Sequence, residues 1–341
     1  NAPPQKIDSY LEQLNKAFET KPPVKNEFPH FYSESTKLYT MDSTKGLNIP
    51  FAITQKGNLS YLRIDHNNCA HVMIGGVPGS GKSVALLSIL NGIVINYDPD
   101  DVEVWAIDYG NTTFGKFKTQ QLPHIRRIIT DKSPEFATAL VDDLNNMVKE
   151  RNLLWEKYNA PGRTLIDDIE KFRAALVASH GTYKKEHLAR RIVILMDEFQ
   201  FFTKALSDKD NKNPLASYRK DLERLLKVLR KCGIHFVFSS QDIPQGSEGF
   251  TQTSENWIPV RLCLRTDGNA TLENQILRLD STVANEVREK MLKDMALTAG
   301  SVVYKRPLMS KEKPGDDCIM EGTNNIIRKN IVIRMATDKD W

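Results

Sequence analysis

From about Leu47 onward, short runs of apolar residues alternate with segments in which apolar residues recur at helical spacing. Two of the runs, at residues 192–196 and 234–239, are apolar at successive positions, which is typical of strands buried on both faces. Similar runs predict further strands at residues 71–74, 102–107, 260–264 and 301–304. Strands that alternate with helices in this way predict an α/β fold in which helices flank a mainly parallel sheet.

Two of the intervening helices are well defined by their apolar stripes. Ser133 is placed to cap the first helix, which begins at Pro134 and extends to about Tyr158. Its apolar face is interrupted by Arg151. The second helix spans about residues 218–232 and is expected to stop at Gly233. Its polar face carries four cations, and we expect this face to be solvated, with contact to a polymer or a second subunit as the alternative. The four cations are Lys220, Arg224, Lys227 and Lys231.

The chain is predicted to consist of an arm and one domain. Residues 1–45 are polar and interrupted by prolines, and one short segment at residues 7–18 has helical spacing. We therefore expect residues 1–45 to form an N-terminal arm or linker and residues 46–341 to form the domain. The polar stretch 204–214 predicts a mobile loop. Because the chain starts without a Met or a signal sequence, we expect it to be a segment of a longer protein.

The composition excludes several classes of protein. Apolar residues make up 40% and charged residues 26%, and no run approaches the roughly 18 apolar residues of a membrane span, so the segment is predicted to be soluble. The net charge of +4 is too small to indicate a nucleic-acid-binding protein by itself. The cysteines are scattered and the histidines lack metal-binding spacing, so we expect neither a zinc site nor disulfides. Reduced thiols in a cytosolic compartment fit this pattern.

The most specific chemical motif follows the predicted strand at residues 71–74. Its fixed positions match the phosphate-binding pattern G-x-x-x-x-G-K-S, between a strand and a helical run. Glycines at these positions let backbone N–H groups converge on phosphate oxygens at a helix N-terminus. We expect Lys82 to reach the β- and γ-phosphates of ATP and Ser83 to bind Mg²⁺. The predicted nucleotide-binding residues are Gly76, Pro78, Gly79, Ser80, Gly81, Lys82, Ser83 and Val84.

A pair of carboxylates, Asp197 and Glu198, follows the buried run at residues 192–196. The end of a buried strand is a costly place for charge, which favours a functional role over packing. We expect Asp197 to hold Mg²⁺ through water and Glu198 to activate the attacking water. An ordinary cap at the end of the strand is the alternative. The order Asp-Glu favours hydrolysis over phosphoryl transfer to a small acceptor.

Polar residues near other strands are further catalytic candidates. Gln241 follows the run at residues 234–239, and its amide could report the presence of a γ-phosphate, with a plain loop glutamine as the alternative. Arg261 and Arg265 lie on one face of an alternating segment, and either is a candidate arginine finger that completes a neighbouring subunit's site. Arg151 is another candidate finger. For each arginine, a structural ion pair is the alternative.

Together, these residues give the chain a resemblance to the FtsK/SpoIIIE family of motor ATPases, from about Leu47 to the C-terminus. The resemblance is carried by "HVMIGGVPGSGKS", "LPHIRRIITDKSPEFATALVDDLNNMVKERNLL", "YNAPGRTLIDDIEKF" and "GIHFVFSSQD". The segment "VWAIDYGNTTFGKFKTQQLPHI" is more similar to the Asp-Phe-Gly segment of type VII secretion motors than to the Asp-Pro-Lys segment of DNA-pumping members. The chain departs from the family at Val77-Pro78 and at the sensor sequence Ser-Ser-Gln-Asp.

The resemblance implies a RecA-like P-loop core that hydrolyses ATP with Mg²⁺, in a homo-oligomer such as a hexameric ring or in a tandem array of ATPase domains. It also implies the cytoplasmic motor domain of a membrane-anchored, type VII secretion-like translocase, with the anchor outside this segment. The cargo is then expected to be a secreted protein rather than DNA. Two alternatives stay open: a double-stranded DNA translocase of cell division or conjugation, and a nucleotide-binding regulatory lobe with little turnover.

Overall fold

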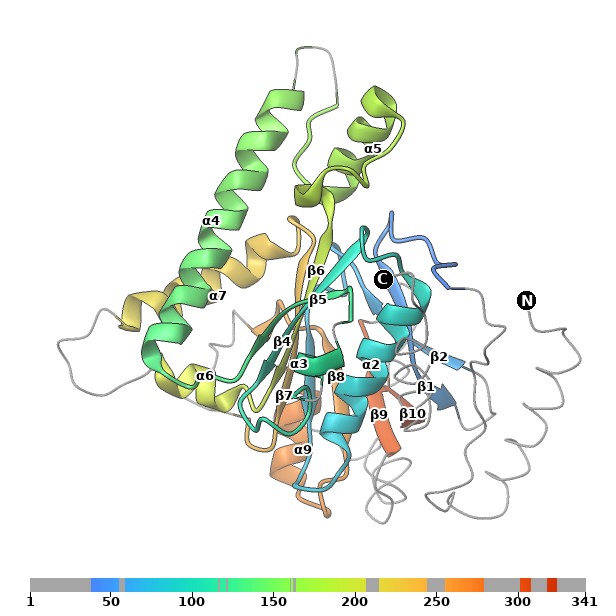
Figure 1. Cartoon of the computed structure of the whole chain (residues 1–341). Helices are drawn as coiled ribbons and strands as arrows, with labels where there is room; N and C mark the ends of the chain where they lie inside the picture. The colour runs from blue at the N-terminus through green and yellow to red at the C-terminus, as the bar shows by residue number, and fades with distance from the viewer. Residues whose placement is uncertain are drawn as a thin grey trace, which may run out of the picture.

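A single sheet forms the centre of the protein (Figure 1). The computed structural model describes residues 38–54, 59–115, 117–120, 122–159, 161, 164–206, 215–243, 255–278, 301–307 and 318–323. Within these residues, the sheet has ten strands in the order β2-β1-β10-β9-β8-β3-β7-β6-β4-β5. The strands are β1 (Leu47–Thr54), β2 (Leu59–Ile64), β3 (Val72–Gly75), β4 (Val102–Asp108), β5 (Ile125–Ile129), β6 (Arg191–Asp197), β7 (Ile234–Ser240), β8 (Val260–Leu264), β9 (Ser301–Lys305) and β10 (Cys318–Thr323).

The sheet has a parallel part and an antiparallel part. Strands β8, β3, β7, β6, β4 and β5 pair in parallel. Strands β9, β10, β1 and β2 extend the sheet from β8 by antiparallel pairing. The six strands predicted from apolar runs are confirmed. Strands β1, β2, β5 and β10 were not predicted individually. The outer strands β2 and β5 contain polar residues that face solvent, so they lack the continuous apolar run of a central strand.

Helices cover both faces of the sheet. The helices are α2 (Lys82–Asn96), α3 (Phe117–Gln120), α4 (Pro134–Tyr158), α5 (Ile169–His180), α6 (Gln200–Ala205), α7 (Leu215–Leu229) and α9 (Ala270–Leu277), with a short 3-10 helix at His187–Ala189. In Figure 1, α4 and α7 lie on one side of the parallel strands and α2 on the other. Alternate residues of the central parallel strands enter two separate cores: Trp105 of β4 packs with the α4 and α7 side, and its neighbour Val104 with the α2 side.

The two predicted helices are both present. The Ser133 hydroxyl accepts a hydrogen bond from the Phe136 N–H at 3.2 Å, which confirms the predicted cap of α4. α7 begins three residues before the predicted start and ends at Leu229. Its four cations are exposed, as expected for a solvated face. Among the described residues, no helix has both the length and the apolar character needed to cross a membrane.

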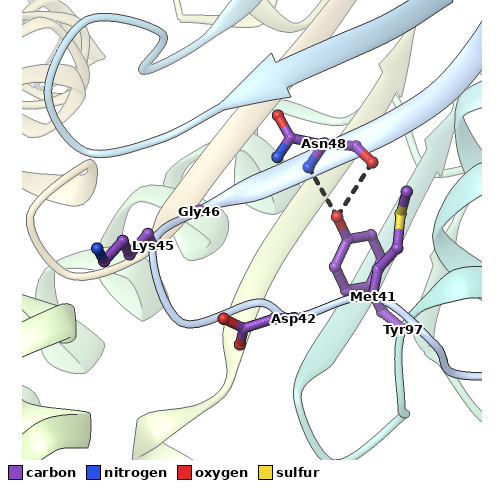
Figure 2. A pocket seen from close by; sticks show the side chains of 6 residues that line it. All are labelled: Met41, Asp42, Lys45, Gly46, Asn48 and Tyr97. Carbon is purple, nitrogen blue, oxygen red and sulfur yellow. Dashed lines mark hydrogen bonds between the residues drawn. The ribbon is translucent and has the colours of Figure 1, made fainter.

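The segment before β1 is fastened to the domain. The N–H groups of Tyr39 and Met41 donate to the carbonyls of Ile95 and Asn96, the last residues of α2, both at 2.9 Å. An open pocket of about 280 Å³ lies beside this segment (Figure 2), far from the start of α2. In it, the Tyr97 hydroxyl accepts from the Asn48 N–H at 2.7 Å and donates to the Asn48 carbonyl at 3.1 Å. Residues 1–37 of the predicted arm and residues 207–214 of the predicted loop lie outside the described residues. The start of that loop, predicted at Lys204, is corrected, because Lys204 and Ala205 form the end of α6.

The buried Arg173 ties this segment to the strands. Its guanidinium donates to the carbonyls of Ser43, Ala189 and Asp101 at 2.7 to 3.0 Å and to the Ser43 hydroxyl at 2.8 Å. Its side chain is inaccessible to solvent. One arginine therefore satisfies buried carbonyls from three separate segments of the chain.

We expect Arg173→Met to lower the free energy of unfolding by about 3 kcal/mol, because the buried carbonyls would be left without a donor. Urea denaturation followed by circular dichroism measures this change, with the exposed Lys185→Met as the matched control. If Arg173→Met lowers the free energy of unfolding no more than Lys185→Met does, Arg173 does not fasten the segment before β1 to the domain.

Candidate nucleotide site

The carboxyl ends of neighbouring parallel strands meet at one edge of the sheet. The last residue of β3, Gly75, pairs with Ser240 of β7, and the last residue of β4, Asp108, pairs with Asp197 of β6. The segments that follow these strands therefore lie together, although they are far apart in the sequence. All of the predicted site residues except the three candidate arginine fingers lie in these segments or at the strand ends themselves.

The loop between β3 and α2 is tightly folded. A Cβ atom on Gly76 would lie 2.7 Å from the Ser80 hydroxyl oxygen and 3.1 Å from the Arg265 carbonyl oxygen, so a larger residue would clash. Gly81, with a φ of +106°, directly precedes α2, which has no capping side chain and no acidic residue in its first turn. An anion at this helix N-terminus would be stabilised by the first N–H groups and the helix dipole.

The other predicted loop residues differ in exposure. Pro78 and Gly79 are exposed at the tip of the loop, and Val84 is half-buried in the first turn of α2. The hydroxyl of Ser80 is buried and has no hydrogen-bond partner in the part of the chain that the structure describes.

Lys82 lies across the loop. Its Nζ atom donates to the carbonyls of Gly76 at 2.9 Å and Val77 at 3.0 Å. Burial lowers the pKa of Lys82, and the nearby Glu198 and Asp197 carboxylates oppose this shift. A cation is therefore present beside the loop, and its hydrogen-bond partners within the described residues are neutral carbonyl oxygens that a phosphate oxygen could replace.

The Asp197 carboxylate accepts hydrogen bonds from several segments of the site. Its oxygens accept hydrogen bonds from the hydroxyls of Ser83 at 3.2 Å, Thr113 at 2.7 Å and Ser239 at 3.0 Å, and from the Glu198 N–H at 3.1 Å. Burial raises the pKa of Asp197, and the Thr113 and Ser239 hydroxyls act against this effect.

The oxygen donors at this point fit Mg²⁺. The Ser83 hydroxyl and the Asp197 carboxylate are hard oxygen ligands in direct contact, as expected for an ion that takes one or two protein oxygens and completes its shell with phosphates and water. No group of three or more His, Cys, Asp or Glu side chains is placed to hold a metal within the described residues, so a metal cage made by protein alone does not fit. Ser83 and Asp197 would hold the Mg²⁺ ion.

Sequence reasoning missed Thr113 and its support, Asp108. Asp108 is fully buried, and its carboxylate accepts from the N–H groups of Thr113 at 2.9 Å and Phe114 at 2.7 Å. These bonds fold the loop after β4 so that the Thr113 hydroxyl reaches Asp197. The signal that identified Asp197, a carboxylate at the end of a buried strand, is also present at Asp108.

Glu198 is held between two amides in a strained backbone conformation. Its φ is +56°, which is unusual for a residue with a side chain. Its carboxylate accepts from the Gln200 amide at 2.6 Å and from the amide of Gln241, which is exposed at the end of β7. The structure thus brings Gln241 and Glu198 together.

The three candidate arginine fingers lie in different places. Arg151 is buried at the opposite edge of the sheet, where it donates to the carbonyls of Arg190 and Cys232. Arg261 is also buried, and it donates to the Ile258 carbonyl at 2.7 Å and forms an ion pair with Glu255 at 3.5 Å. These internal bonds correct the expectation that Arg151 or Arg261 is a finger, because a finger must extend into another subunit.

Arg265 lies on the phosphate loop of its own chain. Its guanidinium donates to the Pro78 carbonyl at 3.4 Å and pairs with Asp267 at 3.1 Å. Its side chain is 27% exposed, so Arg265 is the candidate of the three that both reaches the loop and contacts solvent.

Comparison with known proteins places this site in a family. The FtsK/SpoIIIE family model matches residues 39–245, more than half of the chain, and this range includes the loop, Asp197 and Gln241. The chain belongs to the FtsK/SpoIIIE family. It is 26% identical over 200 residues to the DNA translocase FtsK of Chlamydia muridarum, a match that covers 58% of this chain and 23% of that protein.

Two proteins named as secretion proteins are similar over more of the chain. The ESX secretion system protein YukB of Bacillus subtilis is 22% identical over 241 residues, covering 69% of this chain and 15% of that protein. The cytoplasmic domain of the Thermomonospora curvata type VII secretion ATPase EccC has a TM-score of 0.60 at 16% identity, covering 88% of this chain and 32% of that one. The EccC likeness supports the P-loop ATPase fold, and the chain spans less than a quarter of each of these two curated relatives.

We expect Thr113→Val to raise the Mg²⁺ concentration needed for half-maximal binding of a fluorescent ATP analogue by about tenfold, because an orienting hydrogen bond to the metal-binding carboxylate is lost. Titration of Mg²⁺ at a fixed analogue concentration measures this shift. Thr113→Ser keeps the hydroxyl and should bind like the parent chain. Equal Mg²⁺ requirements for the valine variant and the parent would contradict the positioning role of Thr113.

Proposed function

We propose that this chain is an ATP-hydrolysing motor domain of a translocase. The observation that carries the proposal is the contact between Ser83, at the start of α2, and Asp197, at the end of β6, with Lys82 on the loop and Glu198 beside it. A phosphate loop, a metal-binding pair and a carboxylate base are the groups that hydrolysis of a nucleoside triphosphate requires. Membership of a motor ATPase family supports the same activity.

The site residues would act on ATP as follows. The loop N–H groups and the Lys82 ammonium bind the phosphates, and Glu198 accepts a proton from the attacking water. The water oxygen forms a bond to the γ-phosphorus while the bond from that phosphorus to the bridging oxygen breaks, which yields ADP and phosphate. Mg²⁺, when bound by Ser83 and Asp197, neutralises charge on the phosphates.

The oligomer is part of the proposal. We propose that the domain works in a homo-oligomeric ring, such as a hexamer, or beside further ATPase domains of a longer chain, on the cytoplasmic side of a membrane-anchored protein. The similarity to EccC, whose solved part is named a cytoplasmic domain, supports the cytoplasmic side of this proposal. Within this proposal, Arg265 is the candidate for contact with the nucleotide from the side of β8.

For the cargo, we propose a secreted protein. The segment after β4, Asp108-Tyr109-Gly110, resembles the corresponding segment of type VII secretion motors, and the match with YukB covers more of the chain than the match with FtsK. Translocation of double-stranded DNA is the second candidate function. It is favoured by the higher identity to the DNA translocase FtsK, 26% against 22%.

We expect Glu198→Gln to lower the rate of ATP hydrolysis at least about 100-fold while the chain still binds ATP, because the amide cannot accept the water proton. A coupled phosphate-release assay measures the rate, and a fluorescent ATP analogue measures binding. Lys82→Met is the matched control and should lose binding. Hydrolysis by the Glu198→Gln chain at the parent rate would contradict the role of Glu198 as base.

The cargo is tested by stimulation of hydrolysis. We expect a helical protein exported by a type VII secretion system to raise the ATPase rate several-fold and linear double-stranded DNA to leave it unchanged at both low and moderate salt. Stimulation by DNA that weakens as salt rises would instead identify a DNA translocase, because phosphate contacts are lost to competing cations.

A further inference from the structure

The carboxylate of Glu198 is bonded on two sides by amides from different elements. Gln241, after β7, donates to one oxygen, and Gln200, the first residue of α6, donates to the other at 2.6 Å. Gln241 belongs to the predicted site. Gln200 has no role in the phosphate-loop chemistry described above, so its contact with the catalytic base needs a separate explanation.

The amide of Gln200 is itself held in place. The hydroxyl of Ser240, whose side chain is buried, donates to the Gln200 amide oxygen at 2.6 Å. The amide oxygen and the NH₂ group of glutamine point in opposite directions, so this bond turns the NH₂ group toward Glu198. The Ser240 hydroxyl also lies within hydrogen-bond reach of the Asp242 carbonyl. The Gln200 amide oxygen and the Asp242 carbonyl therefore compete for the single hydroxyl proton of Ser240.

The backbone of Glu198 is constrained as well. Its left-handed φ of +56° is unfavourable for a residue with a side chain and persists only where neighbouring groups impose it. The Glu198 N–H is bonded to the Asp197 carboxylate at 3.1 Å, and its side chain is bonded to the two amides. The base is therefore fixed at both its backbone and its carboxylate.

A general base must place a carboxylate oxygen within hydrogen-bond distance of the attacking water. The two amide bonds leave lone pairs on the Glu198 carboxylate, but they fix the direction in which its oxygens face, so the carboxylate can turn toward a water at another position only if at least one amide bond breaks or bends. Gln241 lies where the sequence predicts a contact with the γ-phosphate, and an arriving phosphate would compete for its amide. The Gln200 bond would still hold the carboxylate, because Gln200 is anchored by Ser240 rather than by the phosphate loop.

We propose that Gln200 is a positioning residue that restrains Glu198 in a resting orientation and so limits the rate of ATP hydrolysis by the unstimulated chain. This inference rests on the proposed ATPase function and deepens it. Ser240 is the anchor of the restraint, and displacement of the start of α6 from β7 is the movement that releases Glu198.

The test is steady-state ATP hydrolysis by the 341-residue chain without cargo, as parent and as Gln200→Ala. We expect kcat to rise at least about tenfold in the variant, the change expected when one hydrogen bond to a charged group is removed from the resting state. The KM for ATP should stay within about twofold of the parent value, because the Gln200 side chain bonds with Glu198 and Ser240, both outside the phosphate loop.

Three further variants make the result specific. The double variant Gln200→Ala with Glu198→Gln should show no rise in kcat, because the rise depends on the Glu198 carboxylate. Ser240→Ala should also raise kcat, because it removes the anchor of Gln200. It tests the restraint independently if Gln200→Ala proves unstable in thermal unfolding. Lys204→Ala, an exposed change on the same helix, should leave kcat unchanged.

A kcat that falls or stays at the parent value in both Gln200→Ala and Ser240→Ala, while a fluorescent ATP analogue still binds, would overturn the restraint and leave the nucleotide site intact. A parent chain that does not bind the analogue would overturn the proposed ATPase function and the restraint together. The binding measurement therefore separates the two failures.

Discussion

A buried carboxylate requires hydrogen-bond donors on its oxygens, and this requirement at Asp197 organises the catalytic edge of the protein. Its partners come from the start of α2, from the loop after β4 and from the last residues of β7. The Thr113 bond fixes the loop after β4, and the Ser83 and Ser239 bonds join α2 and β7 to the end of β6. The loop after β4 depends on a second buried carboxylate, Asp108, which folds it through backbone N–H groups.

The opposite edge of the sheet is organised by buried cations. Arg173 and Arg151 donate to backbone carbonyls of segments that precede or connect the strands, and Arg191 does the same for Ser43 and Thr44. Each planar guanidinium has several donors in fixed directions, so it can satisfy carbonyls from different segments at once. Carboxylates thus hold the edge where phosphate and metal chemistry is proposed, and arginines hold the edge where the chain enters the domain.

Burial and distance along the chain explain which features could be predicted from the sequence. Central strands could be predicted because burial on both faces leaves continuous apolar runs, and Ser133 could be predicted as a cap because its partner lies three residues away. The edge strand β5 could not, since two of its five residues are arginines. Arg151 and Arg261 were assigned wrongly as candidate fingers, because the sequence around a buried arginine has the same pattern as the sequence around an exposed one. The Cys232 carbonyl that accepts from Arg151 becomes its neighbour only in the fold, and the Ile258 carbonyl, although close to Arg261 in the sequence, gives no sign there that the pair is buried.

The bonds of Lys82 suggest how nucleotide binding would spread beyond the loop. Lys82 is bonded to the neutral carbonyls of Gly76 and Val77, and a phosphate oxygen, which carries charge, is a stronger acceptor for an ammonium group. Exchange of these partners would free the first part of the loop. The Val77 N–H is bonded to the Arg265 carbonyl at 2.9 Å, directly after β8, and the Arg265 guanidinium contacts Pro78. Direct contacts thus link Lys82 to the end of β8, the strand that joins the parallel and antiparallel parts of the sheet.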